Sequence, residues 1–94
     1  MKPLRFTVEG AAYDLRPGRA RPGLPSWHVE RNGLHVSLAY PEAGEHAVLF
    51  DDRKTGFRLE LATGAVTAFP RKREYWAARN AAGWPARRRK GVAI

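Results

Sequence analysis

The stretch 26-SWHVERNGLHVSLAY-40 decides the fold, because two runs of alternating apolar and polar residues flank a tight-turn signal. Asn32-Gly33 is the favoured pair for a two-residue type I′ turn, since both positions accept positive φ angles. A hairpin about this turn has one buried face and one polar face. The predicted cross-strand pairs are Val29–Val36 and Trp27–Leu38 on the buried face, and Glu30–His35 on the polar face, which also carries His28 and Ser37.

Similar patterns lie on both sides of this hairpin. Upstream, residues 5–15 (RFTVEGAAYDL) predict a hairpin turning at Gly10-Ala11, which pairs Val8 with Tyr13 and Phe6 with Leu15. Downstream, the apolar runs HAVLF (46–50) and FRLEL (57–61) flank a polar turn. A second turn at Thr63-Gly64 then pairs Leu61 with Val66 and Leu59 with Ala68. We therefore predict about six or seven short antiparallel strands in a meander or barrel-like sheet.

The sequence after the last strand changes to a helical pattern. Residues 71–84 (RKREYWAARNAAGW) are rich in good helix formers and predict a helix over about 71–82. Gly83 suits the left-handed position after the helix, whereas no Ser, Thr, Asp or Asn caps its start. The fold class is therefore mainly β (α+β), with residues 1–85 as one compact domain and 86–94 as a basic tail. Seven strands followed by a helix resemble the element order of pleckstrin-homology-like domains, and SH3-like and chromodomain-like barrels also carry a C-terminal helix; fold alone does not fix function.

The net charge of +8 is concentrated at one end of the chain. Residues 1–70 carry nine basic and eight acidic side chains, whereas residues 71–94 carry eight basic side chains and Glu74 alone. Aromatic side chains are interleaved with these cations. Cations can neutralise phosphates and aromatic faces can stack on bases, so the combination predicts a nucleic-acid surface. Its candidate residues are Arg71, Lys72, Arg73, Arg79, Arg87, Arg88, Arg89 and Lys90, with Trp76 and Trp84 as stacking platforms.

Other uses of these residues stay open at this stage. The tryptophans could pack the helix against the sheet, and the run at 87–90 could be a solvated tail. A second basic surface is possible at 16–25 (RPGRARPGLP), which contains Arg16, Arg19 and Arg21 and no acid. In the predicted register His28, Glu30 and His35 lie on one strand face, where a hydrogen-bonded surface pair is a simpler interpretation than a metal site.

The remaining features favour a binding protein over an enzyme. The 94 residues contain no cysteine, which removes disulfides and thiol chemistry. No nucleophile-elbow motif and no glycine-rich phosphate loop before a helix is present, so we expect no catalytic, cofactor or metal site. No apolar run suits a secretory signal or membrane span, so we expect a cytoplasmic protein without a membrane partner. The expected partner is DNA or RNA, or alternatively an acidic protein surface; the sequence does not specify an oligomeric state.

Overall fold

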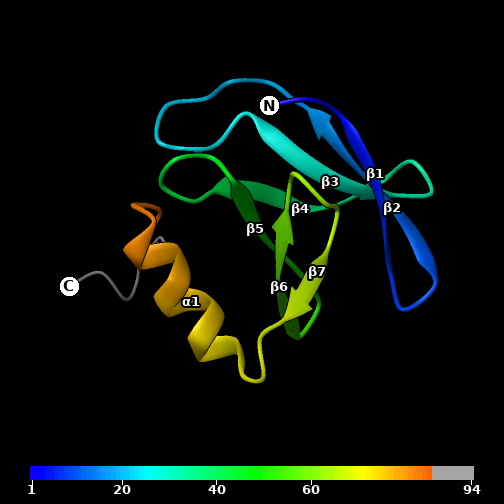
Figure 1. Ribbon diagram of the computed structural model, residues 1–94. Helices are drawn as coiled ribbons and strands as arrows, with labels where there is room; N and C mark the ends of the chain where they lie inside the picture. Colours follow the sequence, from blue (N-terminus) through cyan, green and yellow to red (C-terminus); the bar gives the residue numbers. More distant parts are fainter. Residues whose placement is uncertain (86–94) are drawn as a thin grey trace.

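The computed structural model describes residues 1–85, which form one seven-stranded antiparallel sheet followed by one helix (Figure 1). Each strand pairs with the next along the chain, and the sheet curls into a nearly closed barrel-like form. This confirms the predicted mainly β class with one C-terminal helix; the predicted tail, 86–94, lies outside the described residues. The elements are β1 (Leu4–Val8), β2 (Ala11–Pro17), β3 (Trp27–Arg31), β4 (Leu34–Pro41), β5 (Ala47–Asp52), β6 (Thr55–Glu60), β7 (Val66–Ala68) and α1 (Lys72–Ala81).

The β3–β4 hairpin turns at Asn32-Gly33 as predicted, with φ angles of 55° and 77° at the two positions. Glu30 pairs with His35, also as predicted. Beyond this pair the predictions Val29–Val36 and Trp27–Leu38 are wrong. The register shifts between Val29 and Glu30, so the observed partners are Val29–Ser37, His28–Leu38 and Trp27–Ala39.

This shift is a β-bulge in which β4 carries one extra residue, Val36. The bulge changes the alternation of β4, so that its residues serve two different packing surfaces. Val36 and Ala39 pack into the core inside the curled sheet, whereas Leu38 and Tyr40 pack with the helix on the other side. A strict two-residue period would not have predicted this division.

Two other predicted registers are also wrong, for local reasons. The first hairpin turns at Glu9-Gly10, with φ angles of 51° and 84°, instead of Gly10-Ala11. The turn after β6 is longer than predicted, because the Glu60 amide donates to the Ala65 carbonyl at 2.8 Å. Both errors shift the pairing by two residues and leave the buried faces unchanged. The observed pairs are Phe6–Tyr13 and Leu4–Leu15 in the first hairpin, and Leu59–Val66 and Phe57–Ala68 between β6 and β7.

The core has two parts, on opposite faces of the sheet. The first fills the curled sheet and includes Phe50, whose ring stacks on Phe57 and meets Phe6 edge-on. The second lies between the sheet and α1, and its fully buried members are Leu49 and Tyr75. Strand β5 contributes to both parts, which explains its uninterrupted apolar run: all four residues from 47 to 50 are inaccessible to solvent.

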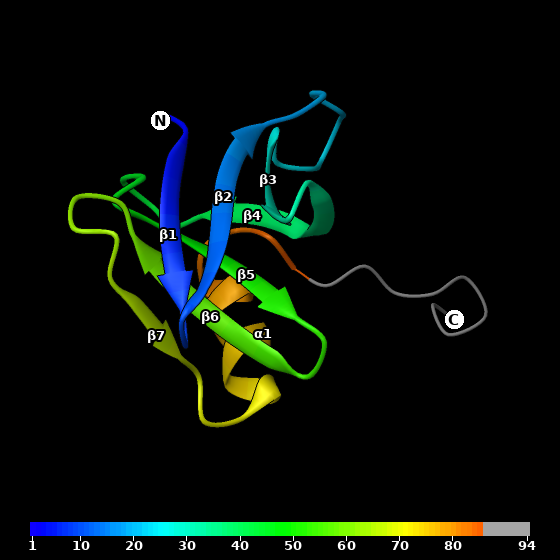
Figure 2. The ribbon, with the colours of Figure 1, turned by 90° about the vertical axis from the view of Figure 1, so that its right-hand side faces the viewer.

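Helix α1 packs against the outer face of the sheet at β5 and β6, behind the strands in Figure 2. A glycine makes this approach possible. A Cβ atom added at Gly56 would lie 2.6 Å from Tyr75 Cδ1, and closer still to Tyr75 Cβ and Cγ. The tyrosine ring therefore occupies the space that a side chain on β6 would fill.

The ends of α1 follow the sequence signals. Arg71 is the N-cap and makes no side-chain capping bond. At the other end Gly83 has a φ angle of 93°, its amide donates to the Asn80 carbonyl, and the Trp84 amide donates to the Arg79 carbonyl at 2.8 Å. These two bonds form a Schellman motif, which turns Trp84 back toward the helix.

Candidate nucleic-acid interface

Helix α1 presents two stripes of side chains, as its sequence period predicts. Tyr75, Ala78 and Ala82 face the sheet and belong to the second core. The other stripe is Lys72, Trp76 and Arg79, in which the Lys72 ammonium lies 5.9 Å from the Trp76 ring centre and the Arg79 guanidinium 4.6 Å from it. The stripe joins the two ends of the helix, about 15 Å apart for its ten residues.

The three cations at the start of α1 are not equivalent. Lys72 forms an ion pair with Asp51, with Nζ 3.1 Å from Oδ2, and donates to the Arg53 carbonyl at 2.9 Å. Arg71 and Arg73 are exposed and form no ion pair within residues 1–85. Lys72 therefore ties the helix to the β5–β6 turn, and the two arginines remain available to a ligand.

Arg79 occupies a different environment from the one expected of a phosphate-binding surface cation. Only 7% of it is exposed, and its carbon Cζ lies 3.6 Å from the centre of the Tyr40 ring. Its Nε has no hydrogen-bond partner in the part of the chain that the structure describes. The guanidinium is thus held by aromatic stacking between α1 and β4.

A hollow of about 350 Å³ opens beside this arginine, and we call it the Arg79 hollow. It is bounded by the helix, the end of β4 and the loop between β2 and β3. Its lining residues are Gly23 and Leu24 from that loop, Tyr40 from β4, Trp76 and Arg79 from α1, and Gly83, Trp84 and Pro85 after the helix.

Trp84 forms one wall of the hollow and also anchors the chain after α1. Its Nε1 donates to the Pro41 carbonyl at 2.9 Å, and its ring meets Tyr40 edge-on with centres 5.9 Å apart. Trp84 and Trp76 are both half-buried. Each tryptophan therefore packs the fold and keeps part of its surface on the hollow, so the packing and stacking interpretations do not exclude one another.

The β2–β3 loop, residues 18–26, brings the second basic segment to this end of the molecule. Arg19 and Arg21 from the loop and Arg16 from the end of β2 are exposed, and none forms an ion pair with the residues described. Gly23 and Leu24 line the Arg79 hollow, whereas Arg19 and Arg21 line a smaller neighbouring cleft. Two basic segments that are far apart in sequence thus adjoin in space.

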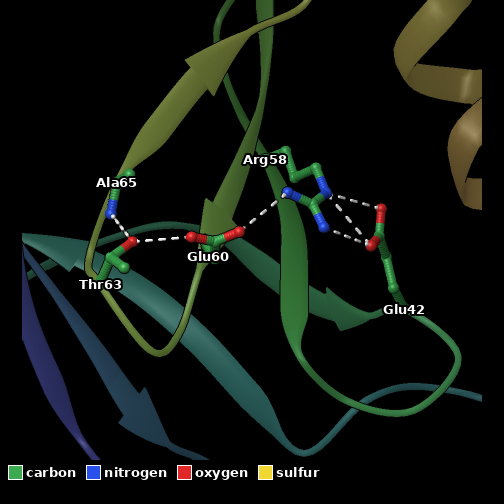
Figure 3. Close-up of polar contacts among 5 residues, drawn as sticks. All are labelled: Glu42, Arg58, Glu60, Thr63 and Ala65. Atoms are coloured by element: carbon green, nitrogen blue, oxygen red, sulfur yellow. Dashed lines mark hydrogen bonds and ion pairs between the residues drawn. The ribbon is translucent and has the colours of Figure 1, made fainter.

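Arginines elsewhere on the sheet are paired with carboxylates. Arg58 on β6 holds Glu42, with Nε 3.2 Å from both carboxylate oxygens, and Glu60 lies 4.0 Å from its Nη1 (Figure 3). Thr63 supports Glu60 by donating to it at 2.9 Å and accepts a bond from the Ala65 amide. Glu42 raises the pKa of Arg58 above its ordinary value by hydrogen bonding to the charged form. This network accounts for Arg58, so we do not include it in the candidate interface.

A further polar cluster lies near the β5–β6 turn. The Tyr13 hydroxyl donates to Asp52 at 2.7 Å and accepts from Arg31 at 3.3 Å. Burial, followed by the bond to Asp52, raises the pKa of Tyr13. These contacts link β2, β3 and β5.

The histidine cluster of the β3–β4 hairpin is a hydrogen-bonded surface group. His28 Nε2 lies 2.6 Å from Glu30 Oε2, and the His28 and His35 rings lie 5.5 Å apart. No group of three or more metal-ligating side chains is arranged to hold an ion within residues 1–85. The same part of the chain contains no helix long and apolar enough to cross a membrane.

The structure therefore brings together some of the predicted site residues and separates others. Arg79, Trp76 and Trp84 surround one hollow, Arg71 and Arg73 lie at the far end of α1, and residues 87–90 lie outside the described residues. The sequence did not predict that Tyr40 and Leu24 line this hollow. A strand-end tyrosine carries no signal by itself, and only the long-range packing reveals its contact with Arg79.

Comparisons of this chain with protein-family models, with curated proteins and with solved structures give no match.

Proposed function

We propose that this protein is a non-catalytic, cytoplasmic nucleic-acid-binding protein that contacts phosphates through the basic residues around α1 and the β2–β3 loop. One observation carries the proposal: among residues 1–85, exposed arginines without carboxylate partners lie at the start of α1 and in the β2–β3 loop, and that loop shares the Arg79 hollow with two half-buried tryptophans. Cations supply affinity for the backbone, and aromatic faces supply stacking that tolerates any base.

The contacts fall into two groups at the two ends of α1. Arg71 and Arg73 form the first, and Arg16, Arg19 and Arg21 form the second, with the run at 87–90 assigned to the same role on sequence grounds. The ten-residue helix between them is about 15 Å long, which equals four or five nucleotides at the duplex rise of about 3.4 Å each. A strand laid along the Lys72–Trp76–Arg79 stripe would meet both groups.

Binding of a ten-nucleotide fluorescent strand, measured by anisotropy over a range of salt concentrations, tests this proposal. Each phosphate contact contributes about −0.7 to the slope of log K against log salt for single strands. Replacing Arg16, Arg19 and Arg21 together by Gln, or Arg71 and Arg73 together, should weaken binding and make the slope shallower. Removal of residues 86–94 should do the same.

A matched control is the double variant Lys2→Gln/Lys54→Gln, which removes two exposed cations that lie outside both groups. The affinity of this control should be close to that of the wild type, with only the small loss that follows from removing two positive charges. If the control loses as much affinity as the Arg71/Arg73 variant, binding depends on net charge alone and the proposed surface is wrong. Absence of binding at low salt would contradict the function itself.

A second candidate function is a protein-interaction module that docks on an acidic partner. The observation in its favour is that, in the part of the chain that the structure describes, β1 and β7 each pair with a single strand, so both are edges to which a partner strand can add. Capture of partners from lysate with and without nuclease treatment separates the two ideas. A defined protein partner that persists after nuclease treatment, with no binding to purified nucleic acid, would favour docking.

A further inference from the structure

Arg79 is the only charged side chain that is buried within residues 1–85. No carboxylate forms an ion pair with it there, and its Nε lacks a hydrogen-bond partner. A buried charge without an opposite charge destabilises a fold, and such charges are ordinarily paired. Aromatic stacking holds the Arg79 guanidinium in place, but it does not supply an opposite charge.

The surroundings of Arg79 determine how it can bind a ligand. The ring centres of Tyr40 and Trp76 lie 3.6 Å and 4.6 Å from the guanidinium carbon, so aromatic rings pack closely against the charged group. Hydrogen bonds from a guanidinium lie in its plane, so a ligand would bind at its edge. An edge that offers two parallel N–H groups matches two oxygens of one phosphodiester or carboxylate.

The Arg79 hollow combines this edge with apolar walls. No carboxylate among residues 1–85 lines it, and Trp76, Trp84 and Leu24 border the space next to the arginine. The volume of about 350 Å³ lies at the small end of the range for ligand pockets, about 300–1,000 Å³. Such a space accepts one group with a flat ring and a single negative charge.

We propose that the Arg79 hollow receives one unpaired nucleotide, with its phosphodiester at the Arg79 edge and its base against Trp76 or Trp84. This inference rests on the proposed function and deepens it, because it assigns a preference for single-stranded over duplex nucleic acid. Bases in a duplex are paired and stacked inside the helix, so they cannot enter a hollow of this kind.

The test compares a ten-nucleotide single strand with a duplex of the same sequence at one fixed salt concentration. Wild-type protein should bind the single strand more tightly. The variant Arg79→Met keeps an unbranched apolar side chain and should lose about tenfold in single-strand affinity, the effect of a charge-assisted hydrogen bond. Its affinity for the duplex should not change. Its thermal midpoint should equal or exceed that of the wild type, because an unpaired buried charge is gone.

A second readout does not depend on that variant. In a Trp27→Phe background the remaining tryptophans, Trp76 and Trp84, both line the hollow. Their fluorescence should be quenched by the single strand and unchanged by the duplex.

Each other result has a definite consequence. Equal affinity for single strand and duplex overturns the inference and leaves the proposed function standing. Binding to neither overturns both. If the Arg79→Met variant loses affinity for the single strand and the duplex alike, Arg79 acts only as a long-range charge, and the inference is refuted. Quenching by benzoate but not by the single strand would assign the hollow to a small carboxylate and also refute it.

Discussion

Replacing Gly56 by Ala should separate helix α1 from the sheet. Gly56 is buried on β6, and a Cβ atom there would lie 2.6 Å from Tyr75 Cδ1 and closer still to the first two carbons of that side chain. Tyr75 Cβ is bonded directly to the helix backbone, so rotation of the side chain cannot move it away. Either α1 moves outward, or β6 bends.

The magnitude follows from two opposing effects. Where the backbone has an ordinary φ angle and open space, Gly→Ala stabilises a protein by about 0.4–1 kcal/mol, because it restricts the unfolded chain. Overpacking a core costs about 1–3 kcal/mol or more. The approach to Tyr75 is far inside normal contact distance, so we expect a net loss of at least about 1 kcal/mol. For a domain of this size each kcal/mol lowers Tm by about 4–8 °C.

The assay is thermal and urea unfolding of the wild type and Gly56→Ala, followed by far-ultraviolet circular dichroism. Tryptophan emission gives a second readout, because Trp76 and Trp84 lie in the second core with Tyr75. The emission should move toward that of solvent-exposed tryptophan if the helix moves outward. A Tm equal to or above that of the wild type, with unchanged emission, would refute the proposed packing of Tyr75 on Gly56.

Three further predictions concern the β3–β4 turn, the hydrogen bond of Trp84 and the ionisation of Tyr75. Gly33→Ala places a Cβ at a φ angle of 77° and should destabilise the protein by about 1–2 kcal/mol in urea unfolding, whereas an unchanged midpoint would argue against the type I′ turn. Trp84→Phe removes the 2.9 Å bond to the Pro41 carbonyl and should cost about 0.5–1.5 kcal/mol by the same measurement; no loss would mean that this bond is replaced by water. Burial raises the pKa of Tyr75 well above its ordinary value of about 10, so its contribution to stability is complete below about pH 10 and falls as pH rises further. Phenolate absorbance should show a late step that appears only on unfolding, and this step should be smaller by one tyrosine in a Tyr75→Phe variant.

The strand order and the helix could be read from the sequence because they depend on local rules. Asn32-Gly33 fixes a turn by its φ preferences, and Gly83 ends a helix for the same reason. The registers were harder to predict, because Val36 can be placed in a bulge at little local cost. Only the need to fill two cores selects that arrangement.

The sequence predicted a basic surface with aromatic side chains, but it did not predict how these residues are arranged in space. The clustering of Arg79 with Trp76 follows from helical spacing, which is a sequence property. The burial of Arg79 against Tyr40 does not, because it needs β4 and α1 to pack across the sheet. The ion pair of Lys72 with Asp51 does not follow from the sequence either, because it joins α1 to β5.

The sequence by itself determined a chain of short antiparallel strands, one C-terminal helix and a strong excess of positive charge at one end, because turns, helix ends and charge are properties of neighbouring residues. The tertiary structure alone decided which cations are neutralised, which one is buried between aromatic rings, and that residues 18–26 adjoin the end of α1. The physical reason is that pairing, burial and hollows arise between segments far apart in the chain, where packing of the whole molecule selects among locally equivalent positions.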